Sequence, residues 1–134
     1  MSKIGLFTLV IALLTSIASC DKSEDPDVYY VKYKVYENAE NLEIEHVSVN
    51  TENGIQRLYG DSDFEVIVGP VEKGFEASMV VEGSGLMEEY VFIEILVSVN
   101  DGPFALKLQE RGILGFGSSE PLQGSMSATY TVGE

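Results

Sequence analysis

The chain has 134 residues, 45% of them hydrophobic, a formal net charge of −14 and a single cysteine, Cys20. This length suits one domain, and one cysteine excludes an internal disulfide. The acidic balance argues against nucleic-acid binding and against docking on an anionic membrane through side chains, because both need clustered Lys and Arg.

The first 19 residues have the three parts of a signal peptide. Lys3 supplies the positive start, residues 4–17 are almost wholly apolar, and small residues precede Cys20. The apolar run is too short to span a bilayer comfortably as a helix. The Ser19–Cys20 junction resembles the lipobox of bacterial lipoproteins, which implies cleavage between these two residues and lipid on Cys20. We therefore expect this covalent lipid to be the membrane anchor, and we expect no other cofactor.

Residues 20–27 are charged and contain a proline, which predicts a flexible tether. The acidic cluster behind Cys20 resembles the export signal of surface lipoproteins in Bacteroidota. That resemblance implies an outer-membrane protein displayed on the cell surface; a domain that faces the periplasm is the alternative. Residues 28–134 are then left for one globular domain.

From Val28 onward the hydrophobic period is two, which predicts strands. The Asn53-Gly54 pair predicts a hairpin, while Gly69-Pro70 and the run Gly83-Ser84-Gly85 are expected to end strands. The expected strands are residues 29–36, 44–51, 55–59, 64–68, 75–82, 90–99, 104–109 and 123–132. Short strands at close spacing predict an all-β fold, an antiparallel two-sheet sandwich of the immunoglobulin or transthyretin kind with seven to eight strands.

The alternation also predicts which side chains face inward. Strand 90–99 is expected to be central and covered on both sides, since its second face also carries Phe92 and Leu96. Ile44 is expected to share the polar face of its strand with His46. The residues expected on one common face are, strand by strand, Tyr29, Val31, Tyr33 and Val35; Val47, Val49 and Thr51; Phe104, Leu106 and Leu108; and Met126, Ala128, Tyr130 and Val132.

Part of the domain resembles a known family. The segments that carry the resemblance are Tyr33-Lys34-Val35-Tyr36, residues 44–49, 66–77 and 92–99, and the turn Asn100-Asp101-Gly102. Over roughly residues 29–102 they are similar to the mycobacterial membrane proteins called MmpS and to the MmpS-like lipoproteins of gut bacteria. Val68-Gly69-Pro70-Val71 stands where that family has a Leu-Pro-Trp element. The resemblance implies a β-sandwich that accompanies an exporter of lipids or siderophores.

Two groups of side chains are candidates for chemistry. Asp61, Asp63 and Glu65 alternate, and a hard cation prefers such oxygen ligands, but the spacing lacks the glycine and distal glutamate of an EF-hand loop. A solvated turn is the preferred interpretation, so we expect no metal. His46 is the only histidine, and no serine stands in a Gly-x-Ser-x-Gly elbow. We therefore expect no enzyme.

Two sets of residues are candidates for contact with a partner. Tyr30 and Tyr36 face away from the expected core, and tyrosine offers a flat apolar ring with a polar tip. Ile113, Leu114 and Phe116 form an apolar segment punctuated by glycines, which is typical of a partner site if it is exposed.

The sequence thus predicts a non-enzymatic, lipid-anchored envelope lipoprotein that acts as a binding or accessory module. An accessory subunit of an envelope lipid or siderophore exporter is one alternative. A surface adhesion or structural component whose strands add edge to edge is another. The expected partner is a protein or a glycan.

Overall fold

A computed structural model of the chain describes residues 25–37, 42–58, 63–85, 90–113 and 122–134. Ser19, Cys20, Asp61, Leu114 and Phe116 lie outside these ranges, as does the side chain of Ile113. Within the described ranges, no helix is long and apolar enough to cross a membrane.

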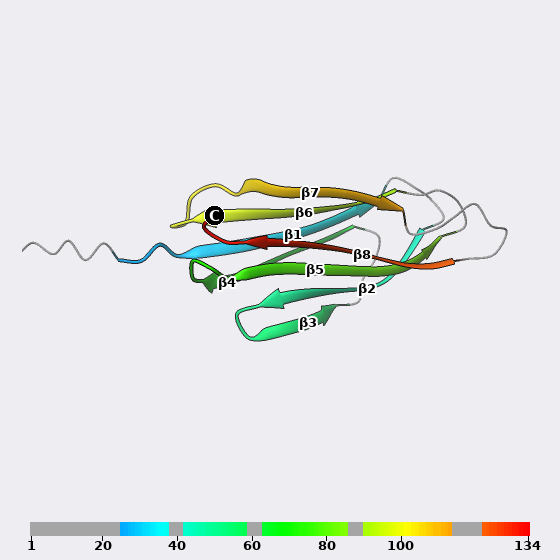
Figure 1. Ribbon diagram of the computed structural model, residues 1–134, viewed down its shortest axis with the longest axis horizontal. Coiled ribbons are helices and arrows are strands. Elements are labelled where there is room, and N and C mark those ends of the chain that lie inside the picture. The colour runs from blue at the N-terminus through cyan, green and yellow to red at the C-terminus, as the bar shows by residue number, and fades with distance from the viewer. Residues whose placement is uncertain (1–24, 38–41, 59–62, 86–89, 114–121) are drawn as a thin grey trace, which may run out of the picture.

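The described residues form eight strands in two antiparallel sheets (Figure 1). Sheet A has the order β4-β1-β6-β7, and sheet B has the order β3-β2-β5-β8. The expected antiparallel two-sheet sandwich is confirmed. The bounds are β1 Tyr29–Glu37, β2 Leu42–Thr51, β3 Gly54–Leu58, β4 Phe64–Val71, β5 Glu76–Gly85, β6 Tyr90–Val99, β7 Ala105–Ile113 and β8 Leu122–Thr131.

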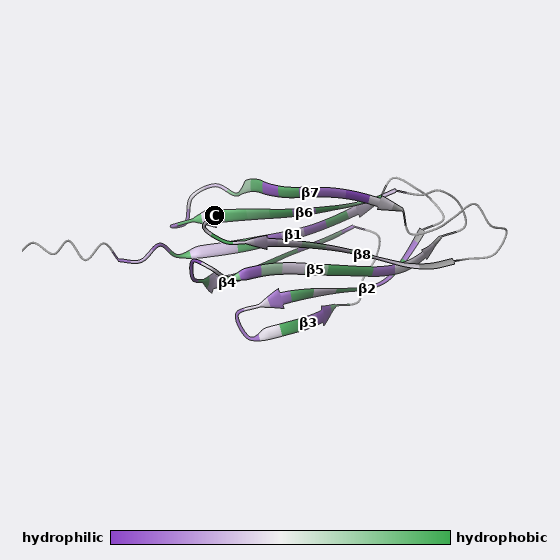
Figure 2. Ribbon diagram, in the orientation of Figure 1, coloured by the Kyte–Doolittle hydropathy of each residue, from purple (hydrophilic) through white to green (hydrophobic). Residues whose placement is uncertain are grey.

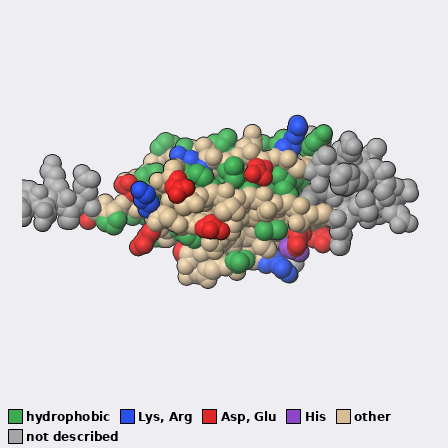
Figure 3. Space-filling view, viewed as in Figure 1, with side chains coloured by type: hydrophobic (Ala, Val, Ile, Leu, Met, Phe, Trp, Pro, Cys, Tyr) green, Lys and Arg blue, Asp and Glu red, His purple; other side chains and the backbone are tan. Residues whose placement is uncertain are grey.

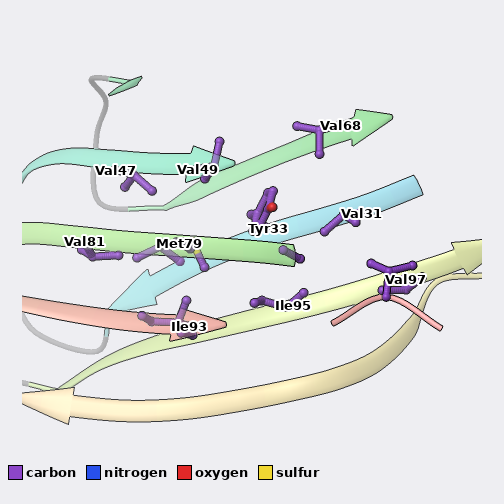
Figure 4. Close-up of a cluster of buried hydrophobic side chains, with 14 of the residues drawn as sticks. Val31, Tyr33, Val47, Val49, Val68, Met79, Val81, Ile93, Ile95 and Val97 are labelled. Carbon is purple, nitrogen blue, oxygen red and sulfur yellow. The ribbon is translucent and has the colours of Figure 1, made fainter. Parts of the chain in front are cut away.

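Side chains from both sheets fill a single core. The alternation of β1 is confirmed, because Val31 and Tyr33 are fully buried while Tyr30 and Lys32 are only half-buried. Figure 4 shows Val31 and Tyr33 of β1 and Ile93, Ile95 and Val97 of β6 opposite Val47, Val49, Met79 and Val81 of sheet B. Valine and isoleucine suit this pleated interior because their branched side chains pack well against neighbouring strands. The apolar stretch of β6 is visible as green in Figure 2.

The prediction for Ile44 is wrong. Ile44 is buried with 7% of its surface exposed, on the same side as Val47, whereas His46 lies on the other face. A β-bulge between Ile44 and His46 inserts one extra residue opposite β5, and this shifts the alternation by one position.

Two strands continue through segments that were expected to end them. β4 passes Gly69-Pro70 and pairs Val71 with Tyr29, which is possible because β4 is an edge strand where proline removes no ladder bond. β5 continues through Gly83 to Gly85 between β2 and β8. A Cβ atom at Gly83 would lie 2.4 Å from the carbonyl oxygen of Glu43. Glycine here therefore allows the bulged strand β2 to approach.

A second bulge separates Leu106 from Leu108. Leu108 pairs with Ile95 and packs on the core, but Leu106 pairs with Leu96 on the opposite face and is 52% exposed. The expectation that both leucines share a face is wrong. β6 is central in its sheet as expected, but Phe92 and Leu96 are half-buried, so its outer face is not fully covered.

The start of β1 and the described C-terminal residues lie at the same end of the sandwich (Figure 1). The predicted hairpin joins β2 and β3 at this end; Thr51 pairs with Gly54, so its corner is Glu52-Asn53, one residue earlier than expected. The turns from β4 to β5 and from β6 to β7 lie there as well. Backbone hydrogen bonds stabilise this end of the sandwich. Gly74 N donates to Val132 O (2.8 Å), and Asn100 N donates to Val28 O (2.8 Å).

Candidate binding face

The side of sheet A that faces away from the core gathers most of the aromatic side chains outside the core. We call this surface the outer face of sheet A. Its members alternate with core residues along β1 and β6 and extend onto β4 and β7. The face consists of Glu65, Ile67, Tyr30, Lys32, Lys34, Tyr36, Tyr90, Phe92, Glu94, Leu96, Ser98, Phe104, Leu106, Gln109 and Arg111.

A polar network crosses the middle of the outer face of sheet A. The carboxylate of Glu94 accepts hydrogen bonds from Tyr36 Oη (3.1 Å) and from Gln109 Nε2 (2.7 Å). The ammonium group of Lys34 lies 3.9 Å from the same carboxylate. Loss of hydration and the neighbouring carboxylate of Glu94 raise the pKa of Tyr36. The hydrogen bonds with Glu94 and Gln109 hold the Tyr36 side chain in one orientation.

Four of the five aromatic rings of this face are held by a neighbouring side chain. Tyr36 and Phe92 stack in parallel with ring centroids 5.0 Å apart and an interplanar angle of 6°. The guanidinium carbon of Arg111 lies 4.6 Å from the ring centroid of Tyr90. Such contacts reduce the side-chain freedom that a binding event would otherwise remove.

Lys32 connects the aromatic residues to the edge strand β4. Its ammonium nitrogen lies 4.3 Å from the ring centroid of Phe104 and 3.5 Å from a carboxylate oxygen of Glu65. Glu65 is thus engaged in an ion pair, while Asp63 is exposed. Among the side chains that the structure describes, no group of three or more potential metal ligands comes together.

The basic residues are concentrated on this sheet. Of the eight Lys and Arg residues in the chain, Lys32 and Lys34 belong to β1, and Lys107 and Arg111 belong to β7. Figure 3 shows blue groups along the upper side of the molecule, where β7 lies in Figure 1. An otherwise strongly acidic protein therefore presents one sheet on which the two signs of charge are mixed.

A depression of about 260 Å³ lies at the end of this face nearest the start of β1. Tyr30 and Phe104 border it on either side of Ser98, whose hydroxyl donates to Gly102 O at 2.6 Å. Ile67 and Asp101 complete the rim. The site combines two aromatic walls with a small polar floor.

The single histidine lies on sheet B, in contact with Glu82 of the neighbouring strand. Their cavity of about 460 Å³ also includes Ser125, which pairs with Glu82 from the other side. In this row the carboxylate stands between the histidine and the serine. A nucleophilic relay needs the histidine in the middle, so this row does not have the required order.

The two tyrosines named from the sequence both lie on the outer face of sheet A. They are six residues apart on one strand, which is about 20 Å, so they belong to opposite ends of it. Phe92, Leu96 and Phe104 were missed as partners because the first two were assigned to a covered face and the third to the core. A signal was available for Phe92 and Leu96, because Glu94 lies between them on the same face of β6.

No protein-family model matches the chain, and no curated protein sequence matches it.

Proposed function

We propose that this protein is a non-enzymatic, lipid-anchored module of the bacterial cell envelope that binds a partner through the outer face of sheet A. The apolar segment before Cys20 and the acidic tether behind it support the anchor. Two acyl chains on one cysteine would hold the domain on a membrane, since each buried methylene contributes about 0.8 kcal/mol. The acidic residues of the tether support display on the surface of the outer membrane.

One observation carries the binding role: five half-buried aromatic side chains lie on the solvent side of sheet A, and stacking, cation–π or hydrogen-bond contacts hold four of them, Tyr36, Tyr90, Phe92 and Phe104. Partly exposed aromatic residues with preorganised rings are typical of recognition surfaces. Cross-strand aromatic pairs also stabilise sheets, and this role accounts for the stacked pair of Tyr36 and Phe92. It does not account for the depression between Tyr30 and Phe104.

The edges of the sandwich favour binding over polymerisation. Of the four edge strands, β4 carries Pro70 and a register shift, β3 has five residues, and β7 carries a bulge and Lys107. The fourth, β8, has ten regularly paired residues and lies in contact with β7 of the other sheet. Natural sheets use such features to avoid edge-to-edge pairing. A structural component that grows by strand addition is therefore the less favoured function.

The anchor is tested by labelling cells with a fatty-acid analogue. The natural chain should incorporate the label, and the Cys20→Ser variant should lose it. Protease treatment of intact cells, with a periplasmic protein as the lysis control, should remove the domain. Survival of the domain in intact cells would contradict surface display, and label on the variant would contradict the anchor.

The binding face is tested by photo-crosslinking in living cells. A photoreactive amino acid in place of Leu106, which is 52% exposed on the outer face of sheet A, should give an adduct. The same group in place of Ser127, which is exposed on the outer side of sheet B, is the matched control and should give none. Adducts only from position 127, or from neither position, would overturn the proposed binding face.

A further inference from the structure

The depression at the start of the outer face of sheet A lies between two aromatic side chains, Tyr30 and Phe104, and we call it the slot. Tyr30 belongs to β1 and Phe104 directly precedes β7, so the two residues flank β6. Neighbouring strands lie 4.7–4.9 Å apart, which separates β1 from β7 by about 9.5 Å. A ring held between two aromatic faces needs about 7–8 Å, twice a carbon–carbon contact distance.

The slot exists because the residue between the two rings is small. Ser98 of β6 lies at its floor with 3% of its surface exposed, and its hydroxyl is held by Gly102 O. Both walls are positioned beforehand. A Cβ atom at Gly69 would lie 2.8 Å from Cδ1 of Tyr30, so glycine leaves room for this ring, and the ammonium group of Lys32 lies over the ring of Phe104.

Charges at the rim restrict the ligand. The exposed carboxylate of Asp101 borders the depression, and the ammonium group of Lys32 covers part of Phe104. A charged ligand of either sign would be repelled by one of these two groups and attracted by the other. A neutral ring with hydroxyl groups avoids both repulsions, because hydroxyls can donate to the carboxylate and accept from the ammonium group.

We propose that the slot between Tyr30 and Phe104 binds one neutral sugar residue of a glycan, with its apolar ring faces against the aromatic walls and its hydroxyls toward Asp101 and Lys32. This inference rests on the proposed binding function and names its ligand class. The remaining outer face of sheet A would contact the neighbouring sugar units.

The test is binding of the purified, lipidated full-length chain to an array of neutral and acidic glycans. The natural chain should bind at least one neutral glycan. Phe104→Ala and Tyr30→Ala should each weaken that binding by about tenfold or more, because each removes one stacking wall. Ile55→Ala is the matched control, since it removes a 79% exposed apolar side chain from β3 of the other sheet, and its affinity should stay within about twofold.

Phe104→Leu serves if Phe104→Ala fails to fold, because it keeps part of the apolar volume while removing the ring, and it should weaken binding in the same direction. Binding to acidic glycans alone, or equal affinity in the wall variants and the natural chain, would overturn the sugar slot. If no glycan binds but position 106 gives a protein adduct, the proposal of a sugar slot is wrong and the proposal that the outer face of sheet A binds a partner is retained. Absence of both would overturn both proposals.

Discussion

Asn100 and Val28 join the turn after β6 to the residue that precedes β1. The backbone nitrogen of Val28 donates to Oδ1 of Asn100 (2.9 Å), and the backbone nitrogen of Asn100 donates to the carbonyl oxygen of Val28 (2.8 Å). Nδ2 of Asn100 also donates to a carboxylate oxygen of Asp27 at 2.7 Å. Asn100 has a φ of 50°, a left-handed conformation that asparagine tolerates better than most residues.

Replacing Asn100 should therefore destabilise the fold in two ways. Asn100→Ala loses the side-chain hydrogen bonds. It also places at positive φ an alanine, whose side chain cannot form the local hydrogen bonds that make this conformation tolerable for asparagine. The free energy of unfolding should therefore fall by about 1–2 kcal/mol. Asn100→Gly loses the same bonds but adopts positive φ freely, and its loss should be smaller. Urea unfolding measures both. Equal losses in the two variants would assign the whole effect to the hydrogen bonds.

Gly83 should tolerate no side chain. Its Cβ position lies 2.4 Å from the carbonyl oxygen of Glu43, which belongs to the backbone of the bulged strand. Gly83→Ala must push two strands apart, and we expect the free energy of unfolding to fall by about 2–3 kcal/mol. Ser84→Ala, one residue along the same strand, is the control and should change stability by less than about 0.5 kcal/mol. A Gly83→Ala variant as stable as the natural chain would show that the bulge can shift at little cost.

Tyr33 should make stability fall at alkaline pH. Its side chain is fully buried, its hydroxyl donates to Asn50 O at 2.7 Å, and burial raises its pKa well above the usual value near 10. The folded state therefore keeps a proton that the unfolded state releases above pH 10. Its stabilising contribution is complete below pH 10 and should fall by about 1.4 kcal/mol per pH unit above it.

The Tyr33→Phe variant separates this effect from other alkaline effects. It cannot release a proton, so its loss of stability between pH 10 and 11 should be less steep than that of the natural chain. At pH 7 it should be about 1 kcal/mol less stable, because Asn50 O loses its donor. Unfolding in urea at pH 7, 10 and 11 measures both quantities. Parallel slopes in the two proteins would contradict the assignment to Tyr33.

The sequence was sufficient for the fold where strands alternate regularly. Tyr29 to Val35 and Met126 to Val132 were assigned to the correct faces, because period two fixes the side chains once one face is buried. The side chains assigned to the wrong face of a strand lie beside bulges. Ile44 and Leu106 changed faces because one inserted residue reverses the alternation, and nothing in their local composition marks the insertion.

Only part of the candidate binding face could be predicted from the sequence, because the rest depends on which strands become neighbours. Tyr30 and Tyr36 were identified from alternation within one strand. The slot depends on β6 and the turn before β7 lying beside β1, with Ser98 between two rings, and this strand order is a property of long-range pairing. Local patterns carry no information about which strands become neighbours.

The place where the chain enters the sandwich determines how mechanical force would pass through the molecule. In the proposed lipid-anchored arrangement, a pull from the membrane reaches β1 first, and β1 is hydrogen-bonded to β4 on one side and to β6 on the other. Tyr30, a wall of the proposed sugar slot, is the second residue of this strand. Tension between a captured glycan and the membrane would therefore act across a few residues at one end of sheet A. The core beyond them, and the whole of sheet B, would carry little of it.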